Sequence, residues 1–124
     1  MKVYVASPYS NGRQASNVKR QLDAMHILMD NGFTPFIPLL NHFAEVHNHR
    51  PESEWFSWDL EWLKMCDALI RIVPIDDNGV TIPSPGADEE EALAISLGIP
   101  AYRVKDLQEL SDWCGVNCIQ SKGV

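Results

Sequence analysis

The chain has 124 residues, a hydrophobic fraction of 45% and a charged fraction of 22%, which are the values of a soluble globular protein with room for one core. Its net charge of −7 and its pI near 4.9 repel a nucleic-acid polymer, and no cluster of Lys and Arg offsets that charge. No apolar run reaches the roughly 18 residues that a membrane-spanning helix needs. We therefore expect a single domain over residues 1–124, with neither a nucleic-acid polymer nor a membrane as its partner.

The opening segment and the cysteines predict the compartment. The segment MKVYVASPYS has one basic residue and a short apolar stretch, which is not the pattern of a secretory signal. Three cysteines give no disulfide framework and suit a reducing environment. Cys114 and Cys118 lack the second pair of ligands that a tetrahedral zinc site needs. We expect a cytoplasmic protein.

Taken along the chain, the sequence predicts strands that alternate with helices. Residues 2–6 read as a strand, and residues 16–30 as a helix with Ser16 or Asn17 as its cap and Asn31-Gly32 as its stop. Further strands are predicted at 33–38, 68–73 and 101–104, and further helices at 52–67, 87–97 and 106–114. The His-rich connector before residue 52 has no clean period, so its structure stays open.

Two of these helices carry apolar side chains at helical spacing, which predicts one buried face on each. In the first helix the side chains are Val18, Leu22, Met25, Leu28 and Met29, and in the helix at 52–67 they are Trp55, Trp58, Trp62, Leu63 and Cys66. We expect most of the four tryptophans to lie in the core, with one available to line a base-binding wall.

The alternation of strands and helices predicts an α/β fold. We expect three layers, with a parallel sheet of four to five strands and helices on both faces, as in flavodoxin-like or Rossmann-like folds. In such folds the ligand binds at the carboxyl ends of the strands, in loops that lead into helices. The loops of interest are therefore SPYSNGR, the connector before ESEW, and SPGADEEE.

Asp59 is spaced to project from the buried face of its helix. It lies four residues after Trp55 and four before Leu63, and such neighbours share one side of a helix. A buried carboxylate costs several kcal/mol unless it is paired or has a function. Two interpretations stay open: an Asp at the border of the apolar face that bonds a neighbouring loop, or a functional carboxylate.

Glu90 is a second carboxylate at an inward position, since it precedes Leu93 by three residues and Ala94 by four. The other acids of this run are expected to face solvent, with Glu91 as a weaker functional candidate: Asp88, Glu89 and Glu91. Alternatively, all four acids only stabilise the helix dipole, at about 0.3–1 kcal/mol each. The preceding loop, Ser84-Pro85-Gly86, is suited to hold an anion, although such a loop is more often a turn and a cap.

No common catalytic or nucleotide signature is present, because GxSxG, GxxxxGK[ST] and GxGxxG are all absent. His42, His47 and His49 have spacings that do not put all three on one helix face, and no HExxH motif accompanies them. We expect no metal and no cofactor. A metal-assisted hydrolase that uses these histidines is the least favoured alternative.

Three segments, KVYVASPYSNGR, WDLEWLKMCDALIRIV and SPGADEEEALA, carry a resemblance that covers most of residues 2–104. Their order and spacing are similar to those of the nucleoside 2-deoxyribosyltransferase family, which includes the 2'-deoxynucleoside 5'-phosphate N-hydrolases. The resemblance implies a homo-oligomeric enzyme that cleaves or transfers at the N-glycosidic bond of 2'-deoxynucleosides or their 5'-monophosphates. A base as acceptor would make it a transferase, and water would make it a hydrolase.

The resemblance also implies catalytic roles. Glu90 would be the nucleophile that forms a covalent glycosyl intermediate, Asp59 would protonate the departing base, and Tyr4 would position or tune Glu90. The rival hypothesis is a non-catalytic nucleotide-binding or regulatory module in which the two carboxylates only organise loops.

The substrate-binding residues that the resemblance implies are Ser7, Arg13, Ser84 and Gly86. Of these, Arg13 and Ser84 match positions that bind the 5'-phosphate in the hydrolases, where Arg would supply a bidentate fork. The base preference stays open.

Overall fold

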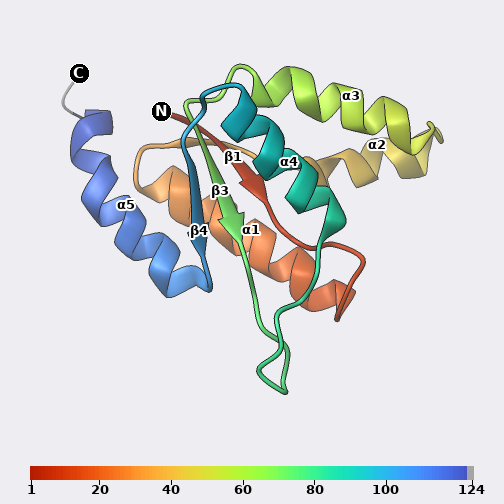
Figure 1. Cartoon of the computed structure of the whole chain (residues 1–124), viewed down its shortest axis with the longest axis horizontal. Coiled ribbons are helices and arrows are strands. Elements are labelled where there is room, and N and C mark those ends of the chain that lie inside the picture. Colours follow the sequence, from red (N-terminus) through yellow and green to blue (C-terminus); the bar gives the residue numbers. More distant parts are fainter. Residues whose placement is uncertain (123–124) are drawn as a thin grey trace.

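A four-stranded parallel sheet forms the centre of the molecule (Figure 1). The computed structural model describes residues 1–122, with side chains described through residue 117. The strands are β1 (Lys2–Ala6), β2 (Thr34–Phe36), β3 (Ala68–Ile72) and β4 (Ala101–Val104). They pair in the order β2-β1-β3-β4, and every pairing is parallel. The predicted parallel α/β fold is confirmed, with four strands.

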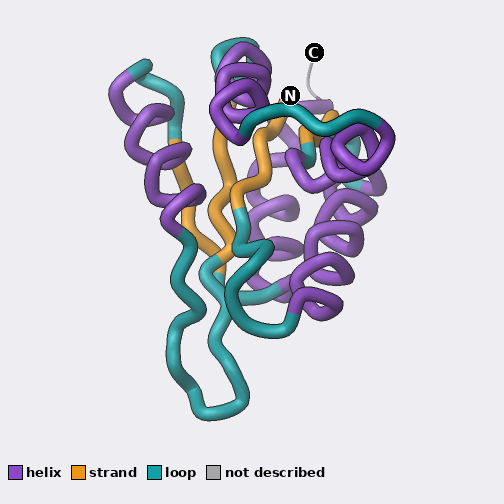
Figure 2. The backbone as a smooth tube through the Cα atoms, turned by 90° about the vertical axis from the view of Figure 1, so that its right-hand side faces the viewer, coloured by secondary structure: helices purple, strands orange, loops and turns teal. Residues whose placement is uncertain are grey.

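Helices cover both faces of the sheet, so the molecule has three layers (Figure 2). On one face, α1 (Gln14–Asp30) and α5 (Leu107–Lys122) pack against side chains such as Val5 and Ile70. On the other face, α3 (Glu52–Leu63) and α4 (Pro85–Ser96) pack against Tyr4, Ala6 and Leu69. No helix among residues 1–122 is long and apolar enough to cross a membrane.

The position of each strand explains its sequence. β1 and β3 lie between two neighbours and under helices on both sides, and therefore read as near-continuous apolar runs. β2 is an edge strand, which is where a proline such as Pro35 is tolerated in a sheet. The connector whose structure the sequence left open forms a 3₁₀ turn, η1 (Pro38–Leu40), and a short helix, α2 (Asn41–His47).

The start of α1 differs from the prediction, because Ser16 and Asn17 both lie inside the helix and neither caps it. The helix begins at Gln14, and Arg13 precedes it without a side-chain capping bond. The buried Asn17 side chain instead donates to the backbone carbonyls of Tyr9 and Asn11, at 2.9 and 2.6 Å. Asn17 therefore holds the loop after β1 in place.

The expectation that most tryptophans lie in the core is wrong. Trp58 and Trp62 are exposed, and Trp55 and Trp113 are only partly buried. The reason is that α3 lies along the edge of the sheet: Trp62 stacks on Phe36 of β2, with ring centroids 5.5 Å apart. The helix thus meets the edge strand with its aromatic side and leaves part of that side in solvent.

Two neighbouring residues of α1 test the layer arrangement. Leu28 is fully buried against the sheet, whereas Met29, which the sequence also assigned to the buried face, is half exposed. We expect Leu28→Ala to lower the free energy of unfolding by about 2–5 kcal/mol, since it leaves a cavity. Met29→Ala is the matched control and should change it by less than about 0.5 kcal/mol. Urea denaturation measures both, and equal losses would contradict the assignment of the core face.

Candidate active site

A pocket of about 610 Å³ lies where the sheet order reverses direction. The chain passes from β1 to β2 on one side and then to β3 on the other, so the loops after β1 and β3 diverge. Parallel α/β sheets bind ligands at this switch point. The pocket is lined by the loop after β1, the η1–α2 connector, α3 and the start of α4.

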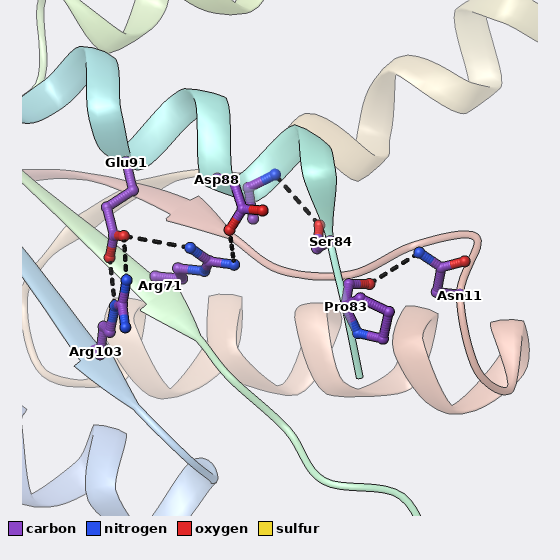
Figure 3. A network of polar contacts seen from close by, with 8 residues as sticks. Asn11, Arg71, Pro83, Ser84, Asp88, Glu91 and Arg103 are labelled. Carbon is purple, nitrogen blue, oxygen red and sulfur yellow. Dashed lines mark hydrogen bonds and ion pairs between the residues drawn. The ribbon is translucent and has the colours of Figure 1, made fainter. Parts of the chain in front are cut away.

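Glu90 reaches the pocket from the second turn of α4. This helix starts at Pro85, and the Ser84 hydroxyl accepts a hydrogen bond of 3.2 Å from the backbone N–H of Ala87 (Figure 3). The hydroxyl of Tyr4, a fully buried side chain of β1, donates a hydrogen bond to Glu90 Oε2. A central strand therefore fixes the carboxylate at the pocket.

Asp59 lines the same pocket from α3, at the side of the helix that faces the connector. Asn41, the first residue of α2, donates a hydrogen bond of 2.7 Å to Asp59 Oδ1. The two carboxylates that the sequence singled out thus line one cavity, although they come from different helices.

Burial shifts the titration of both carboxyl groups toward neutrality. It raises the pKa of Glu90 to about 7, and the negative charges of Asp59 and Glu89 act in the same direction. The hydrogen bond from Tyr4 and the positive charge of Arg71 lower that pKa. Burial also raises the pKa of Asp59 to about 6. The two groups interact, and near pH 6.5 the pair holds about one proton.

Tyr4 stays a hydrogen-bond donor across this range. Burial, and then the negative charge of Glu90, raise the pKa of the Tyr4 phenol far above its ordinary value. The phenol therefore does not compete for the proton that the two carboxyl groups share.

The four predicted substrate-binding residues divide into three that line the pocket and one that does not. Ser7, Ser84 and Gly86 line it. The Ser7 hydroxyl is buried and has no hydrogen-bond partner among the described residues, so it is available to a ligand, whereas the Ser84 hydroxyl already caps α4. Arg13 lies outside the lining and forms a 2.8 Å ion pair with Asp77, with both side chains nearly 80% exposed.

The loops before and after the pocket are tied together. Asn11, in the loop after β1, donates a hydrogen bond of 2.9 Å to the carbonyl of Pro83, just before α4 (Figure 3). Between them, Gly12 has a φ of +79° and lies against Ile82, where a Cβ would approach within 3.2 Å. A glycine at this position therefore allows the close approach of the two loops.

Sequence reasoning missed the contacts that the connector makes with the loop after β1 and with α3 at the pocket. Tyr9 stacks on His42, with ring centroids 3.8 Å apart. Glu45 accepts hydrogen bonds from Trp55 Nε1 at 2.6 Å and from the backbone of Arg50 at 3.0 Å. The Trp55 bond is the main cause that lowers the pKa of Glu45 to about 2. The connector lacks a regular period, so spacing gave no signal of these contacts.

Glu91 does not face solvent as expected. It is buried, and it accepts hydrogen bonds from Arg71 of β3 and Arg103 of β4 (Figure 3). These partners could not be predicted from local sequence, because Arg71 lies within an apolar strand. Asp88 and Glu89 are exposed, as predicted, although Asp88 also pairs with Arg71.

Two of the three histidines of the connector make separate contacts. His42 stacks on Tyr9 and His49 pairs with Glu45. Within the described part of the chain, no group of three or more His, Cys, Asp or Glu side chains is arranged to hold a metal ion.

Solved structures that share this fold include two 2-deoxyribosyltransferases. A 2-deoxyribosyltransferase from the psychrotolerant bacterium Bacillus psychrosaccharolyticus matches with a TM-score of 0.65 at 27% identity, over 87% of this chain and 79% of that one. A 2-deoxyribosyltransferase from Leishmania mexicana matches with a TM-score of 0.62 at 17% identity, over 82% of this chain and 62% of that one. No protein-family model and no curated protein matches the sequence. The chain thus has the fold of 2-deoxyribosyltransferases, while the resemblance to the N-hydrolases stays a prediction.

The raised pKa of Glu90 predicts a pH-dependent penalty on stability. The folded pKa of about 7 exceeds the ordinary value of 4.5, so burial of this group is favourable only while it is protonated. Between pH 4.5 and 8 the wild type should lose up to about 3 kcal/mol of unfolding free energy relative to Glu90→Gln. Denaturation at pH 4.5 and pH 8 measures this difference, with Asp112→Asn, an exposed carboxylate of α5, as control. Parallel pH profiles for wild type and Glu90→Gln would contradict the buried carboxylate.

Proposed function

We propose that this chain is an enzyme that transfers the 2-deoxyribosyl group of a nucleoside through a covalent bond to Glu90. The observation that carries the proposal is that Glu90, hydrogen-bonded by Tyr4, and Asp59 line one pocket. The pKa of Glu90 is about 7 and that of Asp59 about 6. Near pH 6.5 the pair shares about one proton. Retaining glycosyl transfer requires the form with Glu90 ionised and Asp59 protonated, which is the minor one because Glu90 has the higher pKa.

In the first step, ionised Glu90 attacks C1' of the sugar. A bond forms between C1' and a carboxylate oxygen, the C1'–N bond breaks, and Asp59 gives its proton to the departing base. In the second step, a nitrogen of an incoming base attacks C1', the ester bond to Glu90 breaks, and Asp59 takes up the proton. Tyr4 donates to Glu90 throughout and stabilises the carboxylate that leaves.

The charge of the pocket favours an unphosphorylated nucleoside over a 5'-monophosphate. Five carboxylates line it, against a single Arg, Arg50: the acids are Glu45, Glu52, Asp59, Glu89 and Glu90. A phosphate dianion is repelled by such a surface. The ion pair of Arg13 with Asp77, outside the lining, gives no support to a phosphate clamp built on Arg13. Ser7, with its unpartnered hydroxyl, is the better candidate to bind a sugar hydroxyl.

An aromatic wall suits the base. Tyr9, His42, Trp55 and Phe56 line the pocket, and flat rings of this kind stack on a nucleobase. A second base must enter the pocket if transfer rather than hydrolysis is to occur. The Bacillus psychrosaccharolyticus protein is described as a biocatalyst for nucleoside synthesis, which supports transfer here.

We also propose that the chain forms a homo-oligomer. Exposed apolar side chains on α2 and α3 support it, since a second copy would remove them from water: Phe43, Val46, Trp58 and Trp62. One domain over residues 1–124 and a cytoplasmic location, both inferred from the sequence, belong to the same proposal.

A product analysis tests the reaction. The purified protein is incubated with deoxynucleosides, with and without a free base, and in parallel with the deoxynucleoside monophosphates. We expect new nucleosides only when the free base is present, and slower turnover of the monophosphates. Glu90→Gln should lower turnover by at least about 10³-fold, whereas Asp112→Asn should not change it. Ligand binding without any turnover would support the non-catalytic module, and free base as the sole product would make the protein a hydrolase.

The pH dependence tests the division of roles. Attack needs Glu90 ionised and base release needs Asp59 protonated, so kcat/KM should rise with pH up to about 6 and fall above about 7. The pH profile of kcat/KM is therefore bell-shaped, with its maximum near pH 6.5. Asp59→Asn should be slower by about 10²–10⁴-fold and should lose the descending limb, while its rising limb moves to lower pH because a negative charge near Glu90 is gone. A descending limb that persists in Asp59→Asn would assign the acid to another group.

A further inference from the structure

Arg71 is a buried cation near the carboxyl end of a central strand. Its side chain is only 10% exposed, and it extends from β3 beneath α4 (Figure 3). In the sheet it pairs with Ala6 of β1 and with Arg103 of β4. A buried guanidinium is costly unless it is paired with anions, so the positions of its partners define what it does.

The two partners of Arg71 lie on either side of Glu90 in the sequence. Arg71 Nη2 lies 2.5 Å from Asp88 Oδ1, and Arg71 Nη1 lies 3.2 Å from Glu91 Oε1. Residues three apart occupy neighbouring places on one helix face, so Arg71 holds that face against the sheet. Glu90 is turned away from this face toward Tyr4, which binds it from β1. The start of α4 is therefore held at two sides, by two adjacent strands.

Arg103 makes a useful comparison because it shares only one of these partners. Its guanidinium donates two hydrogen bonds to Glu91, at 2.7 and 2.6 Å, but it is 64% exposed. Its charge is therefore screened by water, whereas that of Arg71 is not.

Arg71 is also the cation whose charge acts on Glu90. The groups that face Glu90 from the surrounding elements are Tyr4 of β1, Asp59 of α3, Glu89 of α4 and Arg71 of β3. Asp59 and Glu89 disfavour the ionised form of Glu90, and Tyr4 and Arg71 favour it. Arg71 is the member of this set that combines a positive charge with a fixed place under the helix.

We propose that Arg71 is a positioning residue for Glu90, which fixes the start of α4 on the sheet and favours the ionised form of Glu90 that attack requires. Its effect on the rate rests on the proposed function, whereas its effect on the ionisation of Glu90 does not.

Arg71→Met tests the charge. The variant should fold, because Glu91 keeps both hydrogen bonds from Arg103 and Asp88, 65% exposed, reaches water. We expect the Glu90 pKa to rise by about 0.5–1 unit. Carbon-13 NMR titration of the Glu carboxyl groups measures it, with the Glu90 signal identified by its absence in Glu90→Gln. In kinetics, kcat/KM on the acid side of the profile should fall with the ionised fraction of Glu90, by about 3–10-fold at pH 5.

Two further variants separate charge from geometry. Arg103→Met removes an exposed partner of Glu91 and should leave the Glu90 titration unchanged. Arg71→Lys keeps the charge without the planar fork, so it should restore the titration of Glu90 while kcat stays below that of the wild type.

The outcomes distinguish this inference from the proposed function. An unchanged Glu90 titration in folded Arg71→Met, or an equal shift in Arg103→Met, would overturn the role of Arg71 even if deoxyribosyl transfer is observed. A shift confined to Arg71→Met in a protein that turns over no nucleoside would support the electrostatic role of Arg71 and would sink the proposed reaction instead.

Discussion

A carboxylate held out of water at the mouth of a parallel sheet is the constraint on which the rest of this structure depends. Burial alone would keep Glu90 protonated well above its ordinary pKa, and two further acids near it add to that tendency. The protein opposes this with a phenol from β1 and a guanidinium from β3. Because both come from central strands, the sheet rather than a loop sets the chemistry of the pocket, and a packed core is the part of a protein that moves least.

The fold was accessible from the sequence because its signals are local. Apolar runs separated by helical periods predict strands and helices directly, and the alternation of the two predicts a parallel sheet with covered faces. The same logic placed Asp59 and Glu90 inward, since i, i+4 spacing reports the face of a helix without knowledge of its neighbours. It also placed Trp58 and Met29 inward, and there it was wrong, because spacing does not tell how wide the covered face is.

The parts of the site that could not be predicted depend on contacts between distant segments. Arg71 is a single charge in an apolar strand, and nothing near it in the sequence names Glu91 or Asp88 as its partners. Likewise, the family resemblance selected Arg13 by position in a motif, but in this chain the loop after β3 supplies Asp77, which pairs with it in solvent. Local pattern identifies which residues are available for chemistry, and the tertiary arrangement decides their neighbours.

The strand order has a consequence for how the chain reaches its folded state. β1 pairs with β3, so that Lys2 and Asp67, 65 positions apart, are hydrogen-bonded, and Tyr4 must then find Glu90, 86 positions away. Pairings this distant in sequence form slowly, because the entropy of closing a long loop is lost before the stabilising contacts form. A ribosome adds about 5–20 residues per second, so β1 emerges several seconds before α4. A nascent chain that ends before Glu90 lacks one end of the Tyr4–Glu90 hydrogen bond. The pocket is therefore assembled only after the last third of the chain has begun to appear.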